Sequence, residues 1–526
     1  MVVKSKIILG KYSWTKDKST FVTGFTWLDG KYLSEGNFAR FISEKSTSFE
    51  NFSQTIQRLN GQYSVVVERE GEIWLTASHT WSYPLFYRTT PGQVVITDDP
   101  NKLLIDNQKP EFDKVSEIYF LTFGVTPLSN TLIKNIFQIQ PGEILRIKEQ
   151  NVEASSFLPF PVKIDQKSDP VSENDLREFM LSAFEKYYNR IKERQVLLPL
   201  TRGYDSRFLA CLLKEFGHNN VICATWGRPS SREAGTAKRV AGQLGYEHFF
   251  VDYSKSVNQD FTQSKIFNSY VDFAGHFSSM PFLYEYFGVK ELMEKMVISE
   301  STIALPGHPG DFLRGDHIGW DVVDSDRDYL GSKIISKFGT TFPVKAKERQ
   351  MIHDYIVSNF LDGKAESLKQ GYELWDYKER QCKFIGNSSQ VFAFFGIQSL
   401  MPLFDLDVIK FFSRVPDRQK IDQNLYYSSV EKHFFKKLKV EFDLKTPQPV
   451  RNHSSFKEGI LKMTPHFIKK FYYPLKDDIY YREVTQLLRS SDKEFHFKHP
   501  LRPNAYNSYI TQWYLFSLQK LLGIIR

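Results

Sequence analysis

The stretch VLLPLTRGYDSRFLACLLKEFG, residues 196–217, decides the fold of the C-terminal part of the chain. Residues 196–200 form a continuous apolar run, which is typical of a strand that is buried on both faces of a sheet. A tight turn follows at residues 201–204. Apolar residues then recur at helical spacing up to Gly217, which is a typical helix stop. The stretch therefore predicts a strand, a tight loop and a helix.

The same unit recurs farther along the chain. Residues 221–225 repeat the strand signal, an apolar helical stripe runs from there to Gly245, and a third strand is expected near residues 248–251. A fourth apolar run, residues 303–305, is followed by Gly307. Strands that alternate with helices predict a parallel, doubly wound sheet. From about residue 380 onward the pattern is helical and rich in Phe and Tyr.

The N-terminal part of the chain has a different pattern. Apolar residues alternate at period two in short runs, such as residues 63–67, and Gly or Pro turns separate the runs. Near residues 158–174 prolines gather with polar residues, and Ser172 with Asp175 is typical of a helix start. We therefore expect an α/β protein with two domains, a β-rich one at residues 1–160 and a parallel-sheet one at residues 172–526 with a helical C-terminal part.

Composition excludes several classes of protein. The chain has 526 residues and a net charge of +8, with 25% charged residues, which is too mild a basicity to indicate a nucleic-acid partner. Its three cysteines have no Cys-x-x-Cys spacing, so neither a disulfide framework nor a thiolate zinc site is predicted. No apolar run is long enough for a signal peptide or a membrane span. We expect a cytoplasmic protein without a membrane partner, and an oligomer is compatible with this sequence.

The loops that follow the predicted strands carry the residues most suited to chemistry, because ligands of open α/β sheets bind beyond the carboxyl ends of the strands. The loop from Leu200 to Ser206 combines hydroxyl groups, Gly203 and the amides of a helix start, which favour a bound phosphate. Asp205 would oppose an anion unless a divalent cation bridged the two. A second acid, Asp311, lies in the loop GHPGDF at residues 307–312. We predict that Asp205 and Asp311 converge.

Together these loops resemble the PP-loop, or ATP pyrophosphatase, synthetase domain of the glutamine-hydrolysing asparagine synthetase family. The first loop of that family reads Ser-Gly-Gly-x-Asp-Ser. Here Thr201, Gly203, Asp205 and Ser206 match it, and Arg202 replaces a glycine. The family's adenine-side loop is similar to residues 224–227 and its Gly-x-Gly-x-Asp-Glu loop to residues 307–312. A later motif is similar to residues 396–405, which lack its Glu and Arg.

The N-terminal part resembles the glutaminase half of the same family, which is an Ntn hydrolase. The resemblance lies in residues 59–63 and 84–87. The glutaminase requires a cysteine at position 2, where this chain has Val2, and Ser78-His79 replace an Asp-Arg pair. The missing thiolate would itself be the nucleophile, so neighbouring residues cannot replace it. We therefore expect a degenerate glutaminase-like domain that does not hydrolyse glutamine.

The resemblance implies an ATP-dependent, AMP-forming amide ligase that uses ATP and Mg²⁺. A carboxylate attacks the α-phosphate to give an acyl-adenylate, pyrophosphate leaves, and an amine attacks the acyl carbon. Without a glutaminase the amine would be ammonia or an amino group of the substrate itself, as in the β-lactam and lasso-peptide cyclases. Two other hypotheses stay open: a catalytically inactive pseudoenzyme or scaffold that retains the fold, and a PP-loop enzyme that modifies RNA.

The resemblance also implies roles for individual residues. Asp205 and Asp311 would hold Mg²⁺, and Asp205, His308 and Arg202 would act in catalysis. The nucleotide would contact ten residues: Leu200, Thr201, Gly203, Tyr204, Ser206, Trp226, Gly227, Pro306, Gly307 and Gly310. The lysine that binds pyrophosphate in the family has three candidates here: Lys383, Lys432 and Lys436.

Each of these assignments has an alternative. Arg202 either contacts the polyphosphate or fills the space that a glycine leaves. His308 either accepts a proton from the amine, for which an unperturbed pKa near 6.5 is suitable, or is an ordinary hydrogen-bonded histidine. Trp226 either contacts the adenine ring or packs in the core. Three polar residues lie near a substrate pocket or form a buried polar network: Gln390, Gln398 and Asp405.

Overall fold

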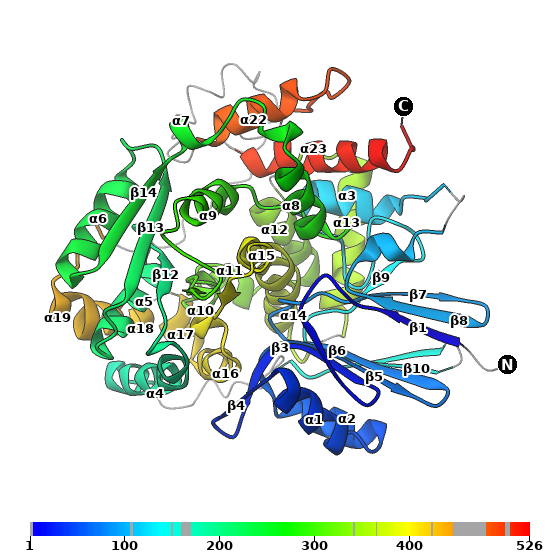
Figure 1. The fold of residues 1–526 in the computed structure, drawn as a ribbon, viewed down its shortest axis with the longest axis horizontal. Helices are drawn as coiled ribbons and strands as arrows, with labels where there is room; N and C mark the ends of the chain where they lie inside the picture. The colour runs from blue at the N-terminus through cyan, green and yellow to red at the C-terminus, as the bar shows by residue number, and fades with distance from the viewer. Residues whose placement is uncertain are drawn as a thin grey trace.

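The computed structural model describes residues 4–105, 109–148, 151–158, 170–339, 342–363, 365–421, 424–444, 480–499 and 505–525. A β-rich N-terminal part and a parallel α/β part lie side by side (Figure 1). The predicted α/β fold class, with a doubly wound parallel sheet and a helical C-terminal part, is confirmed. Val2 lies outside the described residues, as does most of the predicted domain boundary at residues 158–174. The division into domains at 1–160 and 172–526 therefore stays a prediction.

Two sheets form the N-terminal part. The first has the strand order β1-β8-β7-β9, with bounds Lys4–Ile8, Gln93–Thr97, Phe86–Thr90 and Phe137–Gln138. The second has the order β11-β10-β6-β5-β3-β2, with β4 paired to β3. Its bounds are Asn151–Ser156 (β11), Glu143–Lys148 (β10), Glu72–Ala77 (β6), Asn60–Arg69 (β5), Thr20–Leu28 (β3), Trp14–Asp17 (β2) and Lys31–Ser34 (β4).

The alternation in β5 shows how the layers of the N-terminal part are stacked. Val65 and Val67 belong to the same buried cluster as helices α1 (Glu35–Lys45) and α2 (Phe49–Gln57). Val66 points to the opposite face, in the cluster that holds the apolar residues of the first sheet. Helices therefore cover one sheet, and the two sheets pack face to face, as expected for an Ntn-hydrolase-like layering. The period-two pattern predicts the strands correctly but misses α1, α2 and α3 (Lys114–Phe123).

The C-terminal part is built on a five-stranded parallel sheet of order β14-β13-β12-β15-β16. The bounds are Glu247–Asp252, Val221–Gly227, Val196–Pro199, Ile303–Ala304 and Gln398–Ser399. The chain runs from β12 through β13 to β14 on one side and then adds β15 and β16 on the other. The strand order therefore reverses between β12 and β15.

Helices cover both faces of this sheet, which explains the continuous apolar run at residues 196–200. Val196 and Leu198 pack in the cluster of α5 (Tyr204–Glu215) and α6 (Arg232–Leu244). Leu197 points to the other face, in the cluster of α9 (Tyr284–Glu294). In Figure 1 α6 and α9 lie on opposite sides of β13 and β14.

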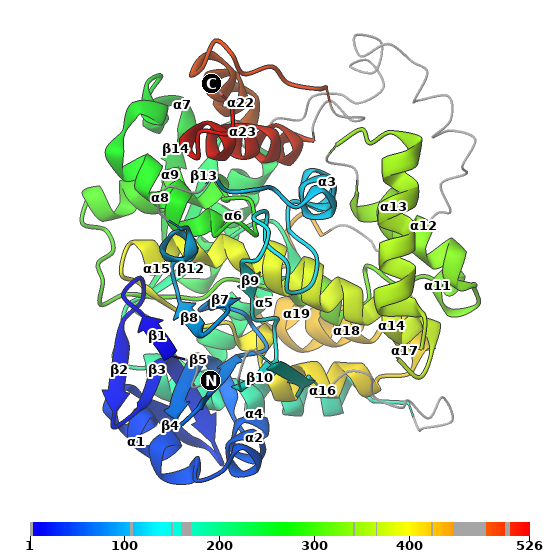
Figure 2. The ribbon, with the colours of Figure 1, turned by 90° about the vertical axis from the view of Figure 1, so that its right-hand side faces the viewer.

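Helices make up most of the remaining chain. Their bounds are Glu173–Ile191 (α4), Tyr253–Ser256 (α7), Lys265–Gly275 (α8), Gly310–Leu313 (α10), Trp320–Val323 (α11), Arg327–Phe338 (α12), Ala346–Ile356 (α13), Leu368–Trp375 (α14), Gln390–Phe394 (α15), Leu406–Arg414 (α16), Asp417–Ile421 (α17), Asn424–Val430 (α18), Lys436–Leu438 (α19), Tyr481–Ser490 (α22) and Tyr506–Leu521 (α23). A π-helix spans Asp376–Ile385 (η4). Figure 2 shows α22 and α23 at the end of the molecule opposite α1 and α2. No helix in the described ranges is long and apolar enough to cross a membrane.

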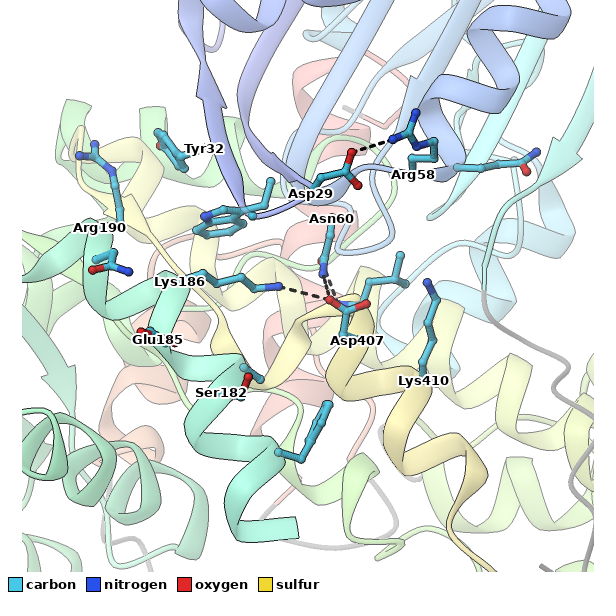
Figure 3. Close-up of a pocket in the computed structure, with 17 residues that line it drawn as sticks. Asp29, Tyr32, Arg58, Asn60, Ser182, Glu185, Lys186, Arg190, Asp407 and Lys410 are labelled. Atoms are coloured by element: carbon cyan, nitrogen blue, oxygen red, sulfur yellow. Dashed lines mark hydrogen bonds and ion pairs between the residues drawn. The ribbon is translucent and has the colours of Figure 1, made fainter. Parts of the chain in front are cut away.

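A buried carboxylate ties the two parts of the chain together. Asp405, which is 1% exposed, accepts a hydrogen bond from Asn60 Nδ2 of β5 (3.0 Å) and one from the Tyr187 hydroxyl of α4 (2.8 Å). Lys186 Nζ, also on α4, lies 2.6 Å from the carboxylate. Asp407 contacts the same Asn60 and Lys186 at the surface (Figure 3). Asp405 therefore neutralises Lys186 while it satisfies donors from both parts of the chain.

We predict that Asp405→Ala lowers the free energy of unfolding by about 3 kcal/mol, because it leaves buried donors and a partly buried ammonium without an acceptor. Asp407→Ala is the matched control. The Asp407 side chain is 57% exposed and shares two of the same partners, so its loss should cost less than about 1 kcal/mol. Urea denaturation of both variants measures the difference, and equal losses would contradict the role given to Asp405.

Candidate functional site

A cavity of about 190 Å³ opens at the carboxyl ends of β12 and β15, where the strand order reverses. Nine of the residues predicted from the sequence line it: Leu200, Thr201, Gly203, Asp205, Ser206, Trp226, Pro306, Gly307 and His308. Tyr204 lies outside this lining, with its hydroxyl bound to Glu431, and Gly227 ends β13. Gly310 packs against the Asp205 side chain. The structure thus brings most of the predicted residues into one crevice.

Two hydroxyl groups organise the loop after β12. Thr201 N donates to Ser206 Oγ at 3.1 Å, and the two side-chain oxygens are 3.0 Å apart. Gly203 N donates to Thr201 Oγ1 at 3.0 Å. Gly203 is also the N-cap of α5, and no described side chain caps this helix start. The first amides of α5 are therefore left for a ligand, and the dipole of the helix favours an anion there.

Arg202 lies outside the cavity. Its backbone N–H donates to Glu233 Oε2 at 2.7 Å, and its Nε is 3.5 Å from Glu233 Oε1 on α6. The side chain lines a separate groove with Arg232 and Arg239. Both alternatives considered for Arg202 put its guanidinium into the phosphate loop, and the structure instead pairs it with α6. The Arg202 side chain therefore does not fill the cavity, and its role in catalysis stays a prediction.

The two acids expected to hold Mg²⁺ are both occupied by protein donors. Asp205 Oδ1 accepts a hydrogen bond from the Tyr426 hydroxyl at 3.0 Å, and Oδ2 forms an ion pair with Arg314. Burial raises the pKa of Asp205 and the Arg314 charge opposes this shift. Asp311 Oδ1 accepts from the N–H of Phe312 at 2.9 Å, and Oδ2 lies 3.4 Å from His317 Nε2.

A chain of charges surrounds Asp311. Burial alone would raise the pKa of Asp311, but His317 and Arg314 hold it well below its ordinary range. Burial likewise opposes the charge on His317, but Asp376, at 2.6 Å, and Asp311 raise the His317 pKa to about 9. His317 is therefore a cation at neutral pH and lies between two carboxylates.

The side chains around Asp205 and Asp311 do not form a site in which the protein alone would hold Mg²⁺. Within the described ranges no group of three or more His, Cys, Asp or Glu side chains is placed to hold a metal ion. Asp205 and Asp311 do lie near each other, because Gly310, which precedes Asp311, packs against the Asp205 side chain. Arg314 and His317 supply the positive charge that the sequence-based prediction assigned to the metal.

His308 is a weaker base than the sequence suggests. Its Nε2 lies 2.9 Å from the Ser388 hydroxyl oxygen. Burial lowers the pKa of His308 to about 4, so the ring is neutral at physiological pH and has little affinity for a further proton. The alternative of a hydrogen-bonded loop histidine agrees with this geometry.

Glu285 is a cavity residue that the sequence analysis misses. It lies in the first turn of α9 and lines the same cavity as the loop after β12. Its Oε2 atom is buried, and no described residue offers it a hydrogen bond. Burial raises the pKa of Glu285 from an ordinary 4.5 to about 7. An acid in the first turn of a helix is common, so the sequence gives no signal that distinguishes Glu285.

The remaining candidates lie away from the loop after β12. Lys383 is buried against Glu379 and donates to backbone carbonyls, Lys432 pairs with Glu173 at the surface, and Lys436 is exposed. Three polar residues join the two parts of the chain: Gln390 bonds to Tyr12, Gln398 to Tyr32 and Asp405 to Asn60. Gln390 and Asp405 are buried polar residues, which agrees with the buried-network alternative for these two, whereas Gln398 is only half-buried.

Trp226 serves mainly as packing. It is 4% exposed, and the backbone of Gly288 on α9 packs against its indole ring. A methyl group at Gly288 would lie 2.6 Å from that ring. Trp226 therefore forms a wall of the cavity and supports α9, the helix that carries Glu285.

A second cavity, of about 1030 Å³, lies at the junction of the β3–β4 hairpin, α4 and α16 (Figure 3). Several of its charges already compensate one another, because Asp29 pairs with Arg58 and Lys186 contacts Asp407. The loop after β12 does not reach it. Its chemistry suits a solvated domain junction better than a phosphate site.

Comparisons with known proteins give partial structural likenesses. No protein-family model matches the chain, and no curated protein matches it. An NH3-dependent NAD synthetase from Campylobacter jejuni matches at 13% identity and a TM-score of 0.21, over 38% of this chain and 98% of that one. An NMN synthetase from Francisella tularensis matches at 15% identity and a TM-score of 0.20, over 47% and 94%.

An amidotransferase gives a third likeness. Glutamine phosphoribosylpyrophosphate amidotransferase from B. subtilis matches at 11% identity and a TM-score of 0.18, over 45% of this chain and 47% of that one. TM-scores this low support no functional conclusion. The function is therefore inferred from the geometry of the site.

We predict that Glu285→Gln stabilises the protein in a pH-dependent way. Between pH 4.5 and about 7 the unfolded chain has lost the Glu285 proton and the folded protein keeps it, so the wild type loses stability as the pH rises. At pH 8 the variant should be more stable by about 1–3 kcal/mol, and at pH 4 the two should be equal.

Denaturation of both proteins at pH 4 and pH 8 measures this difference. Glu294→Gln is the control, because Glu294 lies on the same helix with a side chain that is 61% exposed. A Glu285→Gln variant that is no more stable than the wild type at pH 8 would show that Glu285 is not a destabilised buried acid.

Proposed function

We propose that the protein is an asparagine synthetase-like, ATP-dependent and AMP-forming amide ligase. One observation carries the proposal: the loop after β12 and the loop after β15 meet in a cavity at the point where the strand order reverses. In open α/β sheets this is the place where ligands bind. The free amides of α5 at the same place suit the phosphates of ATP.

The residues around the start of α5 have different roles in the proposed binding of the nucleotide. The Thr201 and Ser206 hydroxyls hold the loop in shape, and Gly203 and Gly307 let backbone approach the phosphates. A Cβ at Gly307 would already lie 3.1 Å from the Ser206 nitrogen, so a larger residue would narrow the crevice. Arg314 neutralises Asp205, which would otherwise repel the phosphates. Mg²⁺, which the resemblance implies, would enter with the nucleotide, because Arg314 and His317 already compensate the two acids.

The substrates follow from the reaction class. A carboxylate oxygen attacks the α-phosphorus of ATP, and pyrophosphate leaves with the bonding electrons. Amides of α5 that donate to the phosphate oxygens stabilise the charge that develops in this step. The amine that then attacks the acyl carbon is ammonia or an amino group of the substrate, because Val2 replaces the cysteine that a glutaminase needs.

A pseudoenzyme that retains the fold is the second candidate. It is favoured by the contact between Asp205 and Arg314, which leaves the expected metal ligand paired within the protein. Incubation of the protein with Mg-ATP, ammonium chloride and a panel of carboxylic acids separates the two functions. A ligase releases pyrophosphate in the presence of its acid, and a pseudoenzyme releases none.

We predict that Gly310→Ala weakens ATP binding at least about tenfold, because small displacements in a binding site have large effects on it. A methyl group at Gly310 would lie 2.2 Å from Asp205 Cγ and would push that side chain toward the phosphate loop. Gly235→Ala on α6 is the control, because the added methyl group meets open space. Calorimetric titration with ATP measures both variants, and equal affinities would contradict the proposed nucleotide site.

A further inference from the structure

We propose that Glu285 binds the amine substrate and accepts its proton when the amine attacks the acyl-adenylate. The inference rests on the proposed function and assigns a residue to its second half-reaction. Glu285 belongs to α9 and lines the same cavity as the loop after β12. A group bound in this cavity can therefore contact both the phosphate loop and Glu285.

The unsatisfied Oε2 atom of Glu285 points to a ligand with an N–H donor. A buried carboxyl oxygen without a hydrogen bond is costly, and most buried polar atoms in proteins have a partner. Tyr253 and Tyr270 interact electrostatically with Glu285, but their hydroxyls donate to the backbone carbonyls of Tyr284 and Phe282. Their protons are therefore committed elsewhere, and an amine would supply the missing donor.

The titratable groups described near Glu285 are either neutral or already paired, so Glu285 is the group best suited to accept a proton in this cavity. Tyr253 of α7, Tyr270 of α8 and Tyr481 of α22 are phenols whose pKa values burial raises well above 10, so all three are neutral. Elsewhere in the cavity lining, Asp205 is paired with Arg314, and burial keeps His308 neutral by lowering its pKa to about 4. Burial raises the Glu285 pKa to about 7, which is near the value that suits a general base at neutral pH.

The step balances with Glu285 as the only proton acceptor. The nitrogen lone pair of an uncharged amine forms the new C–N bond at the acyl carbon. The bond from that carbon to the phosphate oxygen breaks, and AMP leaves with its electron pair. One proton moves from nitrogen to the Glu285 carboxylate, which later releases it to solvent. Ammonia and primary amines are the substrates that this step accepts.

The test separates the two half-reactions in the full-length protein. Exchange of labelled pyrophosphate into ATP, with a panel of amino acids and dicarboxylic acids, reports adenylation. Formation of AMP and amide with ammonium chloride as the amine reports the second step. For Glu285→Gln we expect pyrophosphate exchange within about twofold of wild type and amide formation reduced at least about 100-fold. Glu285→Asp should restore part of the second activity.

The pH dependence of amide formation is a second readout, and it would not change if Glu285 had only a structural role. With the concentration of uncharged ammonia held constant at every pH, amide formation by the wild type should rise with pH through about 7 and then level off, as the Glu285 carboxylate forms. This rise should be absent in Glu285→Gln. Equal losses in both half-reactions, or a rise that persists in the variant, would overturn the role of Glu285 alone. A wild type that exchanges no pyrophosphate with any acid would overturn the proposed function, and this inference with it.

Discussion

The reversal of strand order between β12 and β15 is the constraint on which the site depends. Parallel strands release their loops at one edge of the sheet, and loops on either side of a reversal diverge and leave a crevice between them. Here that crevice receives the loop 201–206 from one strand and the loop 306–312 from the other. Residues 100 positions apart therefore face one another without any loop having to extend far from the sheet.

Burial at this crevice controls the electrostatics. Asp205, Asp311 and Asp376 are acids in a poorly solvated region, where an uncompensated charge is costly. Arg314 and His317 lie among them as cations, so the charges alternate. Glu285 also lines the cavity but is outside this chain of charges, and burial raises its pKa. Neighbouring cations thus hold the pKa of Asp311 below its ordinary range, whereas burial without a cation raises that of Glu285 to about 7.

The sequence predicts the sheet and the loop after β12 well because both depend on local patterns. The apolar run at residues 196–200 and the helical stripe that ends at Gly217 need no distant partner to be recognised. The capping pair Ser172 and Asp175 is likewise a local signal, and both of its hydrogen bonds form at the start of α4. Helices α1 and α2 are missed because each presents only a short apolar stripe toward the sheet.

The electrostatic part of the site could not be predicted in the same way. The position of Arg202 depends on Glu233, and that of Asp205 on Arg314, which lies 109 positions away along the chain. The pKa of Glu285 depends on its burial, and the tyrosines that interact with it come from α7, α8 and α22, which are separate segments of the chain. Long-range packing thus decides which charges are paired, and short motifs do not specify it.

A crystal structure of the protein with a non-hydrolysable ATP analogue tests the central claim most directly. The account predicts that the phosphates lie at the first turn of α5, against residues 201–206 and Gly307, with the carboxyl group of Glu285 in the same cavity. Electron density for the nucleotide in the groove beside Arg202, or in the cavity between α4 and α16, would contradict it.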